Sequence, residues 1–166
     1  MLNIFKKKND SKIYAPINGQ CIDIVDVNDI GFSSKMMGDG VAIIPSNNTV
    51  VSPADGTLMM VFKTGHAFGI KTNDGLELLI HIGIDTVNEE GKGFKILKNS
   101  GDKVKKGTPI IAFDFNSLTE KYDMTTMVIV TNKIDINKIS IGKSVDVNIP
   151  LFERKKMNEA TKENKQ

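Results

Sequence analysis

The alternation of apolar and polar side chains is clearest between residues 77 and 84. Branched apolar residues occupy every second position from Leu78 to Ile84, and this period of two is typical of a β-strand with one buried face. The positions between them, including His81, then point the other way, beside Gly83, whose missing side chain should leave open space. The pattern predicts a strand that presents a histidine outside the core.

A second strand pattern lies just upstream, from His66 to Lys71, and Asn73-Asp-Gly75 between the two runs is a hairpin turn signal. Closing the hairpin on the first two turn residues sets His66 opposite His81. Closing it on the last two sets Phe68 opposite His81, with His66 diagonal to it at about 7–8 Å. Both registers place the chain's only two histidines on one face.

Similar strand patterns recur along the rest of the chain, separated by glycine, proline, asparagine and aspartate. Helical periodicity is scarce, and the best candidate for a short helix is Ser117 to Tyr122. We therefore expect an all-β fold, a sandwich or a closed barrel, with at most short helices. The further predicted strands are Gln20–Val25, Val41–Pro45, Gly56–Phe62, Thr108–Phe113 and Thr126–Thr131.

A short motif occurs twice in the first third of the chain. Pro16-Ile-Asn-Gly19 and Pro53-Ala-Asp-Gly56 each precede a predicted strand. Proline fixes φ and glycine can adopt positive φ, so each motif predicts a turn before its strand. The repetition indicates one structural unit used twice.

Size and charge suit a single globular domain with polar ends. The chain has 166 residues, of which 40% are hydrophobic, and a net charge of +2. Residues 1–12 contribute +3 and residues 151–166 contribute +2, which leaves −3 for residues 13–150. We expect a basic flexible N-terminal tail (1–12), a β-sandwich domain (13–150) and a polar C-terminal tail (151–166). The acidic body argues against nucleic acid and suits basic protein partners.

Cysteine usage and hydropathy indicate the compartment. The single cysteine, Cys21, cannot form an internal disulfide, and the sequence shows neither a signal peptide nor an apolar run of membrane-spanning length. We expect a cytoplasmic monomer without stable membrane insertion.

The two histidine segments also carry a family resemblance. Thr64-Gly-His-Ala-Phe-Gly-Ile and Gly75-Leu-Glu-Leu-Leu-Ile-His-Ile-Gly-Ile-Asp-Thr-Val, together with Gly38-Asp-Gly-Val-Ala-Ile, Val51-Ser-Pro-Ala-Asp-Gly-Thr and Gly91-Lys-Gly-Phe, resemble the enzyme IIA domain of the glucose family of the bacterial sugar phosphotransferase system. The resemblance runs from about Ile13 to Pro150. It implies a β-sandwich of largely antiparallel strands.

The resemblance also implies roles for individual residues. His81 matches the histidine that the small histidine-containing phosphocarrier protein phosphorylates, giving a tele-phosphohistidine that passes its phosphoryl group to the IIB domain of a sugar permease. His66 matches the histidine that steadies the phosphoryl group, and Thr64 the threonine that bonds to this second imidazole. Some relatives also regulate other proteins. Two departures, Gly31 before Phe32 and Met127 in place of a common proline, were expected to leave the histidine pair untouched and to affect the rim.

The chemistry of histidine agrees with such a relay. A neutral imidazole is nucleophilic near pH 7 and can accept and donate phosphate without a metal or nucleotide, so no cofactor is required. A second imidazole can stabilise the charge on the phosphoryl oxygens. A relay also needs a surface for partner proteins, for which the candidates are Phe32, Phe68, Asp85, Val87 and Phe94.

Two other functions compete with the relay. A zinc hydrolase would use His66, His81 and Asp85, but such sites need three protein ligands, usually at an H-x-H or H-E-x-x-H spacing that this chain lacks. The two histidines could still hold adventitious or interface zinc if a partner carboxylate completed the site. A non-enzymatic binding or carrier module is suggested by Gly101-Asp-Lys-Val-Lys-Lys-Gly107, although the modified lysine tip of biotin and lipoyl carriers is missing. The sequence does not specify the sugar.

Overall fold

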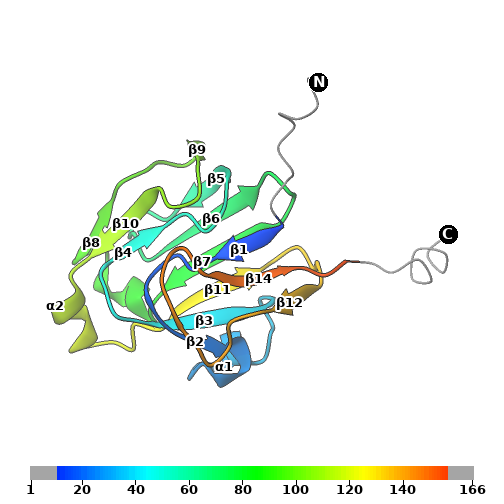
Figure 1. Ribbon diagram of the computed structural model, residues 1–166. Coiled ribbons are helices and arrows are strands. Elements are labelled where there is room, and N and C mark those ends of the chain that lie inside the picture. Colours follow the sequence, from blue (N-terminus) through cyan, green and yellow to red (C-terminus); the bar gives the residue numbers. More distant parts are fainter. Residues whose placement is uncertain (1–10, 157–166) are drawn as a thin grey trace.

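The computed structural model describes residues 11–156, which form a layered, antiparallel β-structure (Figure 1). The strand pairs in all three sheets are antiparallel. The largest sheet contains, in spatial order, β13 (Ser144–Val145), β2 (Gly19–Asp23), β3 (Asp39–Pro45), β11 (Thr126–Val130), β7 (Glu77–Ile82), β6 (Ala67–Thr72), β5 (Gly56–Val61) and β9 (Lys103–Val104).

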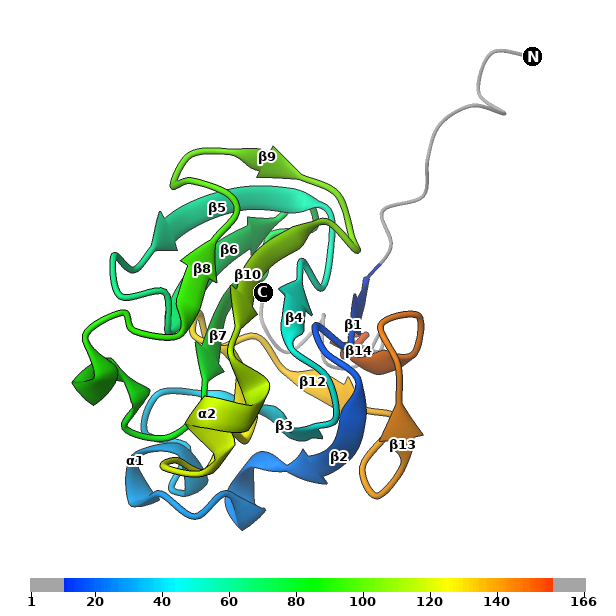
Figure 2. The same ribbon diagram turned by 90° about the vertical axis from the view of Figure 1, so that its left-hand side faces the viewer.

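Two three-stranded sheets complete the structure. One contains β1 (Lys12–Tyr14), β14 (Pro150–Arg154) and β12 (Ile136–Lys138), and the other β4 (Thr49–Val51), β10 (Pro109–Phe113) and β8 (Phe94–Ile96). Figure 2 shows the second of these in front of β6 and β7. The helices are single turns: η2 (Ile24–Asp26), α1 (Ile30–Ser33), η3 (Thr86–Glu89) and α2 (Phe115–Thr119). The predicted all-β class is confirmed.

The seven predicted strands are all present, with ends that differ by one or two residues. The predicted helix at 117–122 is present as α2, which begins two residues earlier, because Asp114 caps it by accepting a bond from the Ser117 amide, and ends three residues earlier, at Thr119. The short strands β1, β4, β8, β9, β12, β13 and β14 and the helix α1 were not predicted. Most of these strands are too short to show a period.

The core occupies both faces of the large sheet near β7. On one face, Phe68 and Ile80 belong to the main cluster, which includes residues of all three sheets. On the other face, Phe32 and Met127 belong to a second, smaller cluster, with Leu79 packed against it. The face that carries His81 is therefore partly covered by the segment that contains η2 and α1, whereas the sequence pattern predicted an open face.

The two Pro-x-x-Gly motifs do precede strands, β2 and β5, and Gly19 has the predicted positive φ, at +159°. Gly56 has no positive φ. A Cβ on Gly19 would lie 2.0 Å from the carbonyl oxygen of Ile44, and one on Gly56 would lie 2.3 Å from that of Lys71. Both glycines are needed because a neighbouring strand approaches the backbone too closely for any side chain.

The domain extends past its predicted end. Residues 150–154 form β14, the central strand of a three-stranded sheet, and Leu151 and Phe152 are completely buried. The boundary predicted at residue 150 is therefore wrong, because these two apolar side chains belong to the main core. At the other end β1 starts at Lys12, one residue earlier than predicted. The rest of the two predicted tails, residues 1–10 and 157–166, lies outside the described residues.

No helix within residues 11–156 is long and apolar enough to cross a membrane.

Candidate active site

The hairpin that carries the histidines closes in a register between the two predicted ones. Its turn has three residues instead of two: the Thr72 amide donates to the carbonyl of Leu76 at 2.8 Å, and Gly75 has φ +94°. Ala67 consequently lies opposite His81. Phe68 pairs with Ile80 and is completely buried in the main core, so its predicted place on the histidine face is wrong.

The two histidines still meet. A regular ladder would turn His66 toward the core, but His66 precedes the first residue of β6 and directly follows Gly65, whose φ is +71°. The ring centroids of His66 and His81 lie 5.1 Å apart at an interplanar angle of 77°. The prediction that the imidazoles lie together is confirmed, although the shared-face argument for it was not correct.

Each imidazole has one nitrogen held by a neighbour two residues away. His81 Nδ1–H donates to the carbonyl oxygen of Gly83 at 2.8 Å, which leaves Nε2 as the lone-pair nitrogen. Thr64 Oγ1 lies 2.5 Å from His66 Nδ1. When the Thr64 hydroxyl donates in this bond, the proton of the neutral His66 ring is on Nε2. One ring then offers a nucleophile and the other a hydrogen-bond donor.

The surroundings keep both imidazoles neutral at pH 7. Burial lowers the pKa of His66, and the neighbouring His81 lowers it further. Burial also lowers the pKa of His81, against the opposing effects of the Gly83 carbonyl, Asp29 and Asp85. A neutral His81 retains the lone pair that a nucleophile requires.

Aromatic rings surround the pair. The Phe32 ring lies 5.1 Å from the His81 ring, and the Phe62 ring lies 5.2 Å from the His66 ring, measured between centroids. Phe32 was predicted at the exposed rim, but it is buried in the second core cluster because α1 packs it against the sheet beside His81. Phe62 was missed, and its position four residues before His66, with a tight turn between them, was the available signal. Val87 is exposed on η3, and Phe94 is partly buried against the main core.

The turn after β7 is built around left-handed residues. Gly83 has φ +79°, and a Cβ there would lie 2.5 Å from Thr86 Cγ2. Gly83 is therefore required by the turn and does not leave the open space that was predicted. Asp85, at φ 61°, is exposed beside it. Glu89 ties the end of η3 to the loop before β11.

This tie consists of two bonds from one carboxylate. Glu89 Oε2 accepts from the Tyr122 hydroxyl at 2.8 Å, and Glu89 Oε1 lies 3.1 Å from Lys121 Nζ. Together with the backbone bond from the Ile84 amide to the Asp123 carbonyl, it fixes the segment that supports Asp85.

The two departures from the family pattern lie closer to the histidines than expected. Met127 is buried on β11 directly opposite His81. Gly31 donates its amide to Asp29 Oδ1 at 2.8 Å, in the helix that brings Phe32 to His81. The expectation that neither touches the histidine pair is wrong for Met127, because its position is the cross-strand neighbour of His81.

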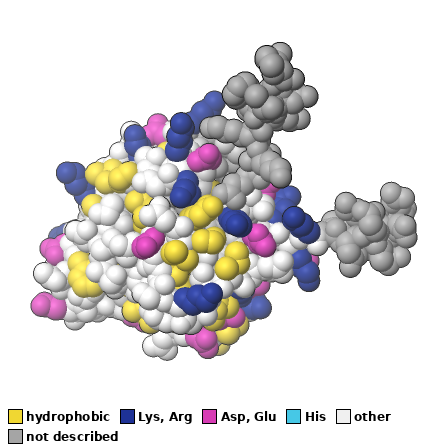
Figure 3. Space-filling view, in the orientation of Figure 1, with side chains coloured by type: hydrophobic (Ala, Val, Ile, Leu, Met, Phe, Trp, Pro, Cys, Tyr) yellow, Lys and Arg dark blue, Asp and Glu magenta, His cyan; other side chains and the backbone are white. Residues whose placement is uncertain are grey.

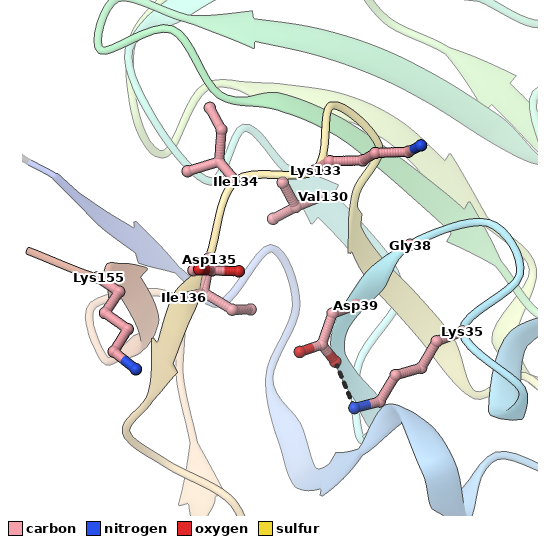
Figure 4. Close-up of a pocket in the computed structure, with 9 residues that line it drawn as sticks. All are labelled: Lys35, Gly38, Asp39, Val130, Lys133, Ile134, Asp135, Ile136 and Lys155. Carbon is pink, nitrogen blue, oxygen red and sulfur yellow. Dashed lines mark ion pairs between the residues drawn. The ribbon is translucent and has the colours of Figure 1, made fainter. Parts of the chain in front are cut away.

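A hollow of about 470 Å³ lies at the other end of β3 and β11 and contains no histidine. Figure 4 shows that its three lysines do not converge: Lys35 pairs with Asp39, at 3.6 Å, while Lys133 and Lys155 point to other sides. We do not assign chemistry to it. Its lining comprises Lys35, Gly38, Asp39, Val130, Lys133, Ile134, Asp135, Ile136 and Lys155.

Metal-ligand clusters of three or more histidine, cysteine or carboxylate side chains are not found among residues 11–156. His66 and His81 supply two ligands, one fewer than a zinc hydrolase needs.

Comparisons with known proteins identify the family. Residues 11–136 match the family model described as phosphoenolpyruvate-dependent sugar phosphotransferase system, EIIA 1. A glucose-specific EIIA component from Halalkalibacterium halodurans is 50% identical over 123 residues, which are 74% of this chain and 71% of that protein. A glucose-specific EIICBA component from Staphylococcus carnosus is 50% identical over 121 residues, 72% of this chain but only 18% of that protein.

A solved structure agrees with this match. The glucose permease IIA from Mycoplasma capricolum aligns with a TM-score of 0.75 and 33% identity, over 89% of this chain and 97% of that one. The chain thus corresponds to about a fifth of the length of the EIICBA relatives and to most of the separate EIIA relatives. It belongs to the EIIA 1 family of the phosphoenolpyruvate-dependent sugar phosphotransferase system.

Proposed function

We propose that this chain is a phosphoryl carrier of the sugar phosphotransferase system. His81 Nε2 accepts a phosphoryl group from the histidine-containing phosphocarrier protein and passes it to the IIB domain of a sugar permease. The observation that carries the proposal is the bond from His81 Nδ1–H to the Gly83 carbonyl, which leaves Nε2 unprotonated beside a second imidazole.

The transfer is a displacement at phosphorus. The lone pair of His81 Nε2 forms the new N–P bond as the N–P bond to the donor histidine breaks. Positive charge then develops on the His81 ring, where Nδ1–H donates to the Gly83 carbonyl oxygen and where Asp29 and Asp85 favour the cationic ring. Transfer to the IIB domain reverses these changes.

His66 acts on the phosphoryl oxygens. With Nδ1 held by Thr64, its Nε2–H can donate to an equatorial oxygen and stabilise the charge that spreads over these oxygens in the transition state. The reaction requires no metal or nucleotide. Zinc at His66 and His81 would need a further ligand, such as a carboxylate from a partner protein.

The partners dock around the histidine pair. Phe62 and Val87 supply exposed apolar contact area, Phe32 supports His81 from the second core cluster, and Asp85 attracts basic side chains. Relatives named EIICBA combine the A component with B and C components in one chain, which supports a IIB domain as the acceptor. Their names include glucose, glucoside and N-acetylglucosamine, so the permease determines the sugar. We expect the carrier to act in the cytoplasm.

Intact-mass spectrometry tests the relay. The chain is incubated with phosphoenolpyruvate, enzyme I and a cognate phosphocarrier protein at neutral to alkaline pH. Wild type should gain one phosphoryl mass and His81→Ala none, because the nucleophile is missing. His66→Ala should accept phosphate but fail to deliver it to a IIB domain. A folded wild type that gains no phosphoryl mass from a competent donor would contradict the proposal.

A further inference from the structure

The charge of this molecule is distributed very unevenly. Residues 91–107 contain six lysines and one aspartate, a net charge of +5. Since residues 13–150 sum to −3, the remainder of the body carries −8. Asp29 and Asp85 belong to that acidic remainder and act on His81.

The lysine-rich segment lies against a region with exposed apolar side chains. A β-bulge in β5 leaves both Met59 and Met60 more than half exposed, at 52% and 53%. The last residue of β8, Ile96, and the next residue, Leu97, are each 38% exposed. Figure 3 shows hydrophobic side chains beside lysines at the upper left, over the connection between β8 and β9.

Hydrogen bonds hold these two segments together. The Gly101 amide donates to the Leu58 carbonyl at 2.7 Å, and the Val61 amide donates to Ser100 Oγ at 2.8 Å. The turn before His66 joins the same region, because a Cβ on Gly65 would lie 3.5 Å from Ile96 Cγ1. We call this surface the basic strip: Met59, Met60, Lys63, Lys95, Ile96, Leu97, Lys98 and Lys103.

We infer that the basic strip is a docking surface for an anionic lipid membrane. Lysines attract an anionic bilayer surface, while apolar side chains of this size enter the boundary between headgroups and acyl chains. Both kinds of group lie side by side here, and all of these side chains are exposed except Lys98, which is half-buried. The acidic remainder of the body would be repelled, so the charges within residues 13–150 favour an orientation with the strip toward the lipid.

An acidic protein is the other partner that such a charge could fit. The lipid is favoured because the strip has no arginine, the residue suited to bidentate carboxylate recognition, and offers flexible methionines and aliphatic side chains instead. The lysines are also spread over separate elements, Lys95 in β8, Lys103 in β9 and Lys63 and Lys98 between strands, which suits a deformable surface.

Vesicle co-sedimentation of the full chain tests the inference. Wild type should bind vesicles of equal parts phosphatidylcholine and phosphatidylglycerol, bind phosphatidylcholine alone weakly, and release at high salt. Each lysine near an anionic surface strengthens binding roughly fivefold. Lys95→Gln with Lys98→Gln should therefore weaken binding more than about tenfold.

A matched variant controls for charge alone. Lys133→Gln with Lys143→Gln removes the same charge from exposed positions outside the strip and should weaken binding less than about threefold. A second pair tests the apolar part: Met60→Ser with Leu97→Ser should weaken binding. Ile139→Ser with Ile141→Ser, at positions outside the strip that are 37% and 41% exposed, should not.

Equal losses of vesicle binding in the strip and control variants would overturn the inference. It would also be overturned if wild type did not bind anionic vesicles. The lysine variant of the strip could instead bind vesicles as wild type does but deliver phosphoryl groups to a IIB domain more slowly. That result would assign the strip to an acidic protein. Vesicle binding needs no phosphoryl transfer, so this result is independent of the proposed function.

Discussion

The chemistry of the site follows from how each histidine is held. The sequence was sufficient to predict that His66 and His81 meet, since a turn signal joins the only two histidines. It was not sufficient for the register, because Asn73-Asp-Gly75 suits both two-residue and three-residue turns. A slip of one residue exchanges the faces of a strand, which is why Phe68 was placed at the site and is found in the core.

Acid should destabilise the folded protein through these histidines. Their folded pKa lies below the ordinary value of 6.5, so the unfolded state binds more protons once the pH falls below about 6.5. Stability is therefore retained above that pH and falls as the pH drops toward the folded pKa values. Urea unfolding at pH 7.5 and 5.5 should show a smaller loss for His66→Gln with His81→Gln than for wild type. Equal losses would contradict the pKa directions.

At the scale of elements, the missed strands share a physical cause. The two-residue strands β9 and β13 have no readable period, and β14 places two buried residues in a segment whose composition is polar. The strands β9 and β13 exist because the longer strands β5 and β2 supply their hydrogen bonds, whereas β14 is held by β1 and β12 on its two sides. Side-chain ties between elements were equally invisible, because they join residues up to about a hundred positions apart, as Lys138 of β12 does with Asp23 and Asp39.

Lys138 should contribute to stability by joining β12 to the large sheet. Its Nζ lies 2.7 Å from a carboxylate oxygen of both Asp23 and Asp39, and its side chain is only 15% exposed. Lys138→Met should lower the free energy of unfolding by about 1–3 kcal/mol, between the values for exposed and buried pairs. Lys133→Met, an exposed control, should change it by less than about 0.5 kcal/mol. Urea titration measures both, and equal effects would exclude this role.

On the scale of the whole molecule, the sequence was sufficient to predict the all-β fold class and the seven longer strands, because strand periodicity and turn residues are local signals. The second core under α1 was not predicted. It forms only when the segment that contains η2 folds back over the outer face of the sheet, which no local pattern records. The predicted domain end at residue 150 was wrong for the same reason, because no local pattern shows that β14 pairs with β1 and β12.

Truncation of Phe152 tests that boundary. The side chain is completely buried in the main core, so Phe152→Ala should cost about 3–5 kcal/mol of unfolding free energy. Glu153→Ala, the partly exposed neighbour on the same strand, should cost less than about 1 kcal/mol. A Phe152→Ala cost as small as that of the control would restore the domain end to residue 150.

The pairing of β1 with β14 places the first and last strands side by side, with Lys12 opposite Glu153 (Figure 1). A linker attached before β1 or after β14 would therefore start from the same corner of the domain. The histidine hairpin therefore has the same position relative to the attachment point, whichever end of the domain carries the linker. The fold is thus suited to use as an interchangeable module, whether joined to other components or separate from them.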